Sequence, residues 1–76
     1  MDKKRLKQLK NGIAERIKTI LEEKDWFQQE LVRRTGMHKG HISLLLNGEV
    51  NLTLETIVAL EEALGEPIIE VANRKR

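Results

Sequence analysis

The stretch QQELVRRTGMHKGHISLLLNG, residues 28–48, decides the fold of this 76-residue chain. It predicts two short helices, at about 28–34 and 38–47, joined by a tight turn at Thr35-Gly36-Met37. Gly36 directly follows the first of them, where a left-handed backbone conformation is needed that only glycine adopts cheaply. Two helices that pack at a steep angle across such a turn need apolar or small residues at fixed positions. Those positions hold Leu31, Val32, Gly36, Met37, Ile42 and Leu45.

One amphipathic helix is predicted on each side of this pair. Before it, apolar residues recur at three- and four-residue steps and predict a helix from Ile13 to Lys24. Asn11-Gly12 either breaks that helix from a looser basic turn or is absorbed into one longer helix, at a cost of ~1 kcal/mol for the glycine. After the pair, Thr53 is a good N-cap for a fourth helix, which is expected to end at Gly65.

The ends of the inner helices and the C-terminal segment also carry signals. Asp25 and Gln28 have the spacing of a capping box, which gives Trp26 as an alternative to Gln28 for the start of the second helix. The indole of Trp26 is expected in the core. Gly48 is expected to end the third helix. Residues 67–71 are too apolar and β-branched for a tail and predict a short strand or extended arm. Residues 73–76 are expected to be disordered.

These patterns together predict an all-α protein, a small bundle of four to five helices with a short C-terminal extended arm. We divide it into a basic N-terminal segment (1–12), a helical domain (13–65), and an arm and tail (66–76). Aromatic and β-branched residues are too few for a sandwich or barrel. The absence of cysteine excludes a disulfide scaffold and suits a cytoplasmic protein, and no apolar run approaches the ~20 residues that cross a membrane. We expect no cofactor.

The charge is distributed unevenly, although the net charge is only +2. Residues 1–24 carry eight Lys and Arg against four acidic residues, whereas residues 49–76 carry three against six. The basic end is therefore able to lie near phosphates, and the acidic end is not. The alternative for the first ten residues is a solvated helix face.

The third predicted helix has an outer face that is free to enter a major groove. At 100° per residue from Ile42, the outward direction falls on Gly40, Leu44 and Asn47. His41 and Ser43 lie at the sides of that face. Lys39 lies near the helix N-terminus, where it is able to reach a guanine edge or a phosphate.

The order and spacing of these pieces resemble the Xre/Cro-type helix-turn-helix domain of phage and bacterial repressors, which has the lambda-repressor-like fold. The resemblance covers residues 13–64. Its matching pieces are IKTILEEK (17–24), QQEL (28–31), RTG (34–36), HIS (41–43), LNG (46–48) and LTLETI (52–57). Residues 63–71, ALGEPIIEV, add a likeness to short antitoxins of the HigA type, which repress their own operon and neutralise a toxin.

The resemblance implies a role in DNA binding for particular residues. Gln28 matches a phosphate-binding glutamine, and Asn47 matches a position that meets the DNA backbone. Lys39, Gly40 and Leu44 match base-reading positions. His38, as the helix cap, and His41 and Ser43, which flank the reading surface, complete the expected interface.

Several residues depart from the family pattern. Phe27 stands where a capping threonine is usual, and Val32 stands where a small alanine is usual. Leu44 replaces a polar reader, so it is able to touch a thymine methyl but not to form a bidentate hydrogen bond. Gly40 offers no side chain, and Glu49 lies where a basic phosphate contact is expected. These departures indicate modest sequence specificity, or a third helix adapted to another partner.

Other chemistries have little support in the sequence. His38 and His41 lie one helical turn apart, but a metal site needs further ligands and none is obvious nearby. Glu22-Glu23 and Glu61-Glu62 are typical of solvated helix faces, and Ser43 has no buried acid to complete a triad. We therefore expect no enzyme activity. For Leu44, contact with a DNA groove, contact with a protein and incidental exposure stay open.

We expect a sequence-specific transcriptional regulator, a repressor that binds double-stranded DNA as a homodimer on a palindromic operator. Half-sites lie roughly 34 Å apart in such operators. Residues 68–71 of the arm are a candidate for pairing across the dimer axis. The alternative is a protein-interaction module, such as the antitoxin of a toxin–antitoxin pair, with weak or secondary DNA binding and a cognate toxin as partner.

Overall fold

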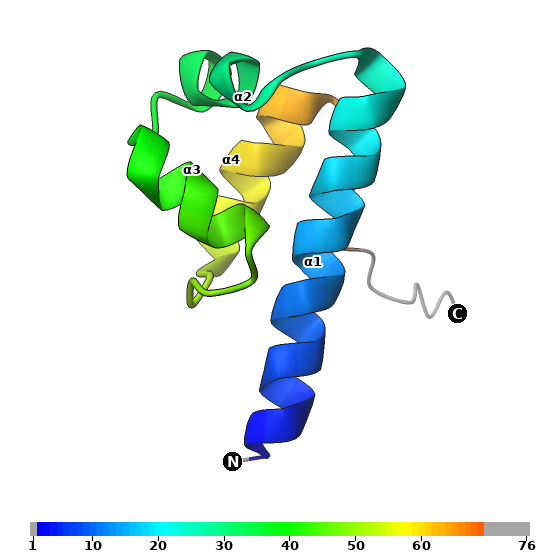
Figure 1. The fold of residues 1–76 in the computed structure, drawn as a ribbon, viewed down its shortest axis with the longest axis vertical. Coiled ribbons are helices and arrows are strands. Elements are labelled where there is room, and N and C mark those ends of the chain that lie inside the picture. The colour runs from blue at the N-terminus through cyan, green and yellow to red at the C-terminus, as the bar shows by residue number, and fades with distance from the viewer. Residues whose placement is uncertain (1, 70–76) are drawn as a thin grey trace, which may run out of the picture.

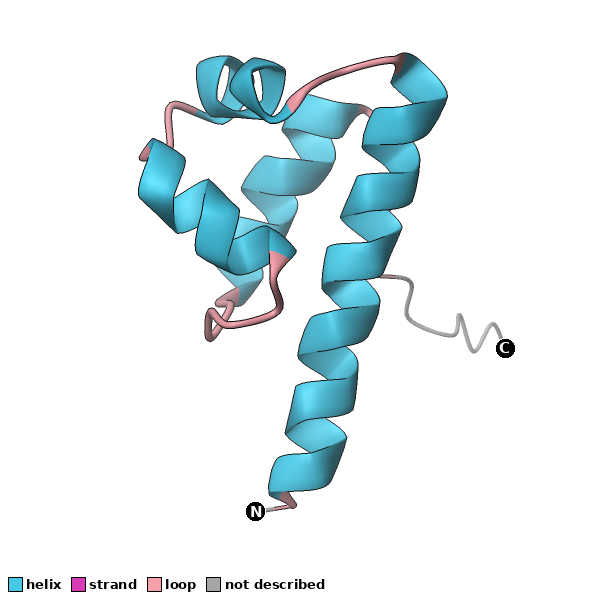
Figure 2. Cartoon of the chain, viewed as in Figure 1, coloured by secondary structure: helices cyan, strands magenta, loops and turns pink. Residues whose placement is uncertain are grey.

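Four α-helices build the computed structural model, which describes residues 2–69 of the chain (Figure 1). They are α1 (Lys3–Lys24), α2 (Gln28–Thr35), α3 (Lys39–Leu46) and α4 (Leu54–Leu64). Figure 2 shows that helices and loops account for the whole of this described part, without a strand. None of these helices is both long enough and apolar enough to cross a membrane. The prediction of a small all-α bundle is confirmed.

The first helix is longer than its apolar stripe alone predicts. It runs without interruption from Lys3 to Lys24, so Gly12 lies inside it and the longer of the two expected helices is the one formed. Asp2 caps the start, because its carboxylate accepts hydrogen bonds from the N–H groups of Lys4 and Arg5 at 3.0 and 3.2 Å. This cap holds the basic N-terminal turns in helical form.

The capping box predicted between Asp25 and Gln28 is wrong. Asp25 instead ends α1 in a left-handed conformation with φ of 58°, which aspartate tolerates better than most residues. The N-cap of α2 is Phe27, and no side chain hydrogen-bonds to the first turn of that helix. The second helix begins at Gln28, the start predicted from its pattern, and not at the alternative start, Trp26. Trp26, in the connection, is half-buried and packs against the edge of the core.

The other helix ends agree with the sequence. His38 and Thr53 are the N-caps of α3 and α4, and each side chain accepts a hydrogen bond from a backbone N–H in the first turn. Gly36 and Gly65 end α2 and α4 in the left-handed conformation, with φ of 73° and 72°. Gly48 has φ of 74° and follows α3 by two residues. Glycine at all three positions avoids the steric cost of a Cβ.

One core joins all four helices. α2 packs against both α3 and α4, while the middle of α1 packs against α3 (Figure 1). The buried members of the core are Ile17, Ile20, Leu21, Leu31, Ile42, Leu45, Leu46, Leu60 and Leu64. The burial of Ile42, Leu45 and Leu46 fixes which face of α3 points outward.

The described part of the C-terminal segment folds back on its own chain. Ile68 packs against the core, and the N–H groups of Ile68 and Ile69 donate to one oxygen of Glu61 at 2.7 and 3.0 Å. The guanidinium of Arg16 donates to the carbonyl oxygen of Pro67. The rest of the expected arm, residues 70 and 71, and the expected disordered tail lie outside the described residues.

Candidate nucleic-acid interface

The outer face of α3 is exposed because the residues of its inner face pack in the core. Ile42, Leu45 and Leu46 are buried, which leaves the opposite side of this eight-residue helix to solvent. Exposed residues on or beside that side are His38, Lys39, Gly40, Ser43, Leu44 and Asn47, and His41 is half-buried at its margin. The face predicted from helical periodicity is thus the one that the fold presents.

A groove between α2 and α3 brings together two of the expected contact residues. Gln28, the first residue of α2, and Lys39, the first residue of α3, line it with Gln29 and Val32. Its volume is about 450 Å³. Val32 therefore helps to line the groove from which the two polar side chains extend. The amide and ammonium groups are both suited to bind phosphate or base-edge oxygens.

The start of α2 adds an electrostatic element to this groove. A helix N-terminus carries a partial positive charge and backbone N–H groups that lack partners within the helix. The side chain of Phe27, which is 83% exposed, cannot accept a hydrogen bond from those groups as that of threonine does. The N–H of Glu30 donates to the carbonyl oxygen of Phe27 at 2.9 Å, so Gln28 and Gln29 supply the N–H groups of the first turn that are suited to bind an anion.

Leu44 gives the centre of the outer face an apolar character. Its side chain is 47% exposed, and the neighbouring Gly40 contributes no side chain at all. Such a surface is able to approach a base pair closely and to contact a thymine methyl, but it carries few hydrogen-bonding groups. The exposed side chains able to form hydrogen bonds on or beside this face include Lys39 at its start, with Ser43 and Asn47 farther along.

His38 is engaged as a cap. Its Nδ1 accepts a hydrogen bond from the N–H of Gly40 at 3.1 Å. Within residues 2–69, no group of three or more His, Cys, Asp or Glu side chains is placed to hold a metal ion.

Arg33 and Arg34 both form ion pairs with the carboxylate of Glu30 on their own helix. Both hydrogen-bond to the same oxygen of Glu30, and the Nε of Arg34 lies 2.6 Å from it. The hydrogen bond from Arg33, followed by that from Arg34, lowers the pKa of Glu30, and the same contact raises the pKa of Arg33. The guanidinium of Arg34 also lies 4.1 Å from the centroid of the Trp26 ring. These contacts tie both arginines to the surface of α2.

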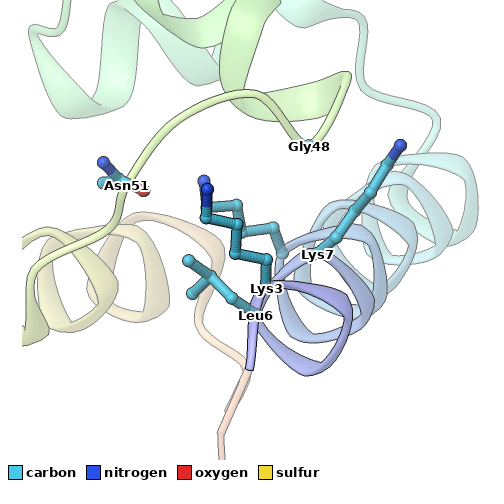
Figure 3. Close-up of a pocket in the computed structure, with 6 residues that line it drawn as sticks. Lys3, Leu6, Lys7, Gly48 and Asn51 are labelled. Atoms are coloured by element: carbon cyan, nitrogen blue, oxygen red, sulfur yellow. The ribbon is translucent and has the colours of Figure 1, made fainter. Parts of the chain in front are cut away.

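A second groove contains residues that the sequence analysis does not single out. Lys3, Lys7 and Lys10 of α1 line it together with Leu6 and with two residues of the α3–α4 loop, Gly48 and Asn51 (Figure 3). Its volume is about 460 Å³. The spacing of the three lysines, at steps of four and three residues, is a signal for one helix face. Their position beside α3 depends on the tertiary fold.

The comparisons with known proteins agree with this geometry. The model of a helix-turn-helix family matches residues 17–71, which include the end of α1 and the whole of α2, α3 and α4. No curated protein and no solved structure shows a significant match to the chain. The match covers well over half of the chain and is centred on the helix pair that presents the outer face of α3. The chain belongs to the Xre/Cro-like helix-turn-helix family of DNA-binding regulators.

Proposed function

We propose that this protein is a sequence-specific transcriptional repressor that occupies a palindromic operator as a homodimer. The observation that carries the proposal is the meeting of Gln28 and Lys39 in one groove, at the start of an α3 whose outer face is exposed. A phosphate ligand and a base-edge ligand are thereby offered side by side. Duplex DNA presents the same pair of groups at the edge of its major groove.

Base readout in this proposal comes from the first two turns of α3. Lys39 donates to a guanine edge, where O6 and N7 are acceptors in the major groove. Gly40 lets the backbone approach the bases, and Leu44 contacts a thymine methyl. Because only one of these three residues forms a hydrogen bond through its side chain, the specificity rests on shape and apolar contact as well as on polar readout.

Phosphate contacts in this proposal position α3 in the groove. Gln28 and the first turn of α2 bind one phosphate, and Asn47 binds another beyond the end of α3. His41 and Ser43 lie at the margin of the reading face and contact the backbone from there. Lys and Arg side chains that neutralise further phosphates release counterions, so the affinity falls as the salt concentration rises.

A homodimer follows from the size of the domain. A module with one eight-residue reading helix contacts too little DNA for tight binding, so two copies on half-sites roughly 34 Å apart are needed. Leu54 and Val58 support this, because they lie one turn apart on α4 and are 77% and 50% exposed. The N–H groups of Ile68 and Ile69 are bonded to Glu61 of the same chain. Pairing of the arm across the dimer axis would therefore use other backbone groups.

The second candidate function is a protein-interaction module, such as an antitoxin whose DNA binding is secondary. Two exposed apolar side chains favour it: Phe27 before α2 and Leu44 on α3 are 83% and 47% exposed. Glu49, in the loop after α3, is exposed as well and repels phosphate. A small toxin-like reading frame beside the gene, and co-purification of its product with this protein, would favour this function over the first.

The repressor proposal is tested with DNA from immediately upstream of the gene. Fluorescence anisotropy at ~150 mM salt compares that DNA with a scrambled duplex of equal length, and sedimentation of the complex gives the number of protein copies. We expect two copies per site and a preference of at least about 10³ for the upstream DNA, which is the lower end for specific regulators. Equal, weak binding to both duplexes would contradict the proposal and favour the protein-interaction module.

A further inference from the structure

The N-terminal half of α1 carries a row of lysines along one side of a cleft, of which Lys3 and Lys7 are exposed and Lys10 is half-buried. Lys3, Lys7 and Lys10 recur at helical spacing and line the same cleft, with Asn51 of the α3–α4 loop on its other side (Figure 3). From Lys3 to Lys10 the helix rises by about 10 Å, at ~1.5 Å per residue. The positive charge is therefore spread along the cleft, as the charge of a phosphate chain is, and not focused on one point.

No carboxylate neutralises this row within the part of the chain that the structure describes. The ion pairs there use Glu15, Glu30 and Glu66 with other cations. The nearest acidic residue in sequence, Asp2, accepts hydrogen bonds from two backbone N–H groups of α1. Like charges one turn apart on a helix repel one another, so an external anion that neutralises them stabilises the arrangement.

The position of the cleft connects it to the reading helix. Gly48 follows the end of α3 by two residues, so the lysine cleft lies at the C-terminal end of that helix. The groove with Gln28 and Lys39 lies at its N-terminal end. An eight-residue helix is about 12 Å long, which equals the ~12 Å width of the major groove. The two clefts thus lie at opposite ends of a helix about as long as the major groove is wide.

We propose that Lys3, Lys7 and Lys10 form a second phosphate-binding site for duplex DNA, on the strand opposite to the one bound by Gln28. The inference rests on the proposed DNA binding by α3. It also accounts for Glu49 in the α3–α4 loop, because the adjacent face of α1 supplies the positive charge that this loop lacks. The site binds phosphates of any sequence, so it adds affinity without adding base discrimination.

The test compares two charge-matched triple variants on upstream and scrambled duplexes over a range of salt concentrations. The first is K3Q/K7Q/K10Q, and the control is K4Q/R5Q/K18Q, which removes the same charge from residues of α1 that do not line the cleft. Circular dichroism checks that both variants keep the helical content of the wild type. Each lost phosphate contact lowers the slope of log affinity against log salt by ~0.9, so the cleft variant is expected to lose about 2.7 and the control much less.

The expected result is an equal loss of affinity on both duplexes for the cleft variant, with its preference for upstream DNA unchanged. Equal salt slopes for the cleft and control variants would overturn the second site while leaving the wild-type preference intact. A wild type without any preference, but with the slope difference present, would overturn the repressor proposal and keep the lysine site. Absence of duplex binding at low salt would overturn both.

Discussion

The guanidinium of Arg16 donates two hydrogen bonds to the carbonyl oxygen of Pro67, from Nε at 3.2 Å and from Nη2 at 3.1 Å. The two residues are 51 positions apart in the sequence. Glu61 completes the attachment from the other side, because its carboxylate accepts the N–H groups of Ile68 and Ile69. A cation on α1 and an anion on α4 thus hold the segment after α4 against the bundle.

Replacing Arg16 with alanine is expected to loosen this segment and to lower the free energy of unfolding by about 1 kcal/mol, the usual value of a partly exposed hydrogen-bond pair. Urea unfolding followed by the fluorescence of Trp26, the single tryptophan, measures the change. Lys18→Ala is the control, because it removes an exposed ion pair with Glu15 on the same helix, which contributes little. Equal stability of R16A and wild type would contradict the account of this attachment.

The attachment is also expected to depend on pH through Glu61. The N–H groups of Ile69 and then Ile68 lower the pKa of its carboxyl group below the ordinary value of about 4.5. A pKa that is lower in the folded than in the unfolded state means that the fold stabilises the charged carboxylate. The charged carboxylate of Glu61 therefore contributes fully to the stability of the attachment above pH 4.5. This contribution is lost as the pH falls through the lower pKa of the folded state.

Amide hydrogen exchange at Ile68 and Ile69 measures this locally, with faster exchange relative to the unfolded chain expected on acidification. A local measurement is needed because Glu30 also has a lowered pKa and contributes to global acid stability in the same direction. Glu61→Gln keeps an acceptor oxygen but does not titrate, so its protection is expected to be independent of pH. Identical pH profiles for E61Q and wild type would exclude this role of the carboxylate.

Gly12 offers a stabilising substitution. It lies in the interior of α1 with helical backbone angles, and a Cβ added there would meet no atom within 4 Å. Gly12→Ala is therefore expected to raise the free energy of unfolding by ~1 kcal/mol, through the difference in helix propensity. Urea unfolding of wild type and G12A measures this difference in the free energy of unfolding. A loss of stability would indicate that the helix is interrupted at Asn11-Gly12.

Gly48→Ala is expected to lower the free energy of unfolding, in contrast to Gly12→Ala. The φ of Gly48 is 74°, and a Cβ there would lie 2.2 Å from Oδ1 of Asn11. The left-handed conformation alone costs a residue with a Cβ about 1–2 kcal/mol, and Asn11 must also move. Gly36→Ala is the matched control, because it has the same conformation, φ of 73°, with open space around it. A G48A variant as stable as wild type would contradict the geometry of this loop.

The sequence predicts local features of this fold well because they depend on near neighbours. Thr53 and His38 cap helices through their own side chains, and Gly36 and Gly65 end helices for reasons of backbone geometry. The outer face of α3 could likewise be predicted, since the burial of Ile42 and its neighbours fixes the rotation of the helix.

The errors and omissions have two physical origins: two roles competed for one residue, and residues far apart in the sequence came together through tertiary packing. Asp25 has a side chain suited to start α2, but the left-handed turn at the end of α1 uses it first. Lys3, Lys7 and Lys10 form a visible helical row, but their cleft exists only because α1 packs beside the loop that follows α3. Neither outcome follows from spacing alone.

The central claim is that α3 reads DNA through Lys39 and Leu44. The most direct measurement is anisotropy of K39A and L44A on upstream and scrambled duplexes at ~150 mM salt. K18A is the control for the lost charge, and L9A is the control for the lost apolar side chain, since Leu9 is 50% exposed and Leu44 is 47% exposed. The account predicts that K39A reduces the preference for upstream DNA by about 5-fold or more, as expected for ~1–3 kcal/mol of lost base discrimination, and that L44A reduces it through the lost methyl contact, while both controls keep it. An unchanged preference in K39A and L44A would contradict the assignment of α3 as the reading helix.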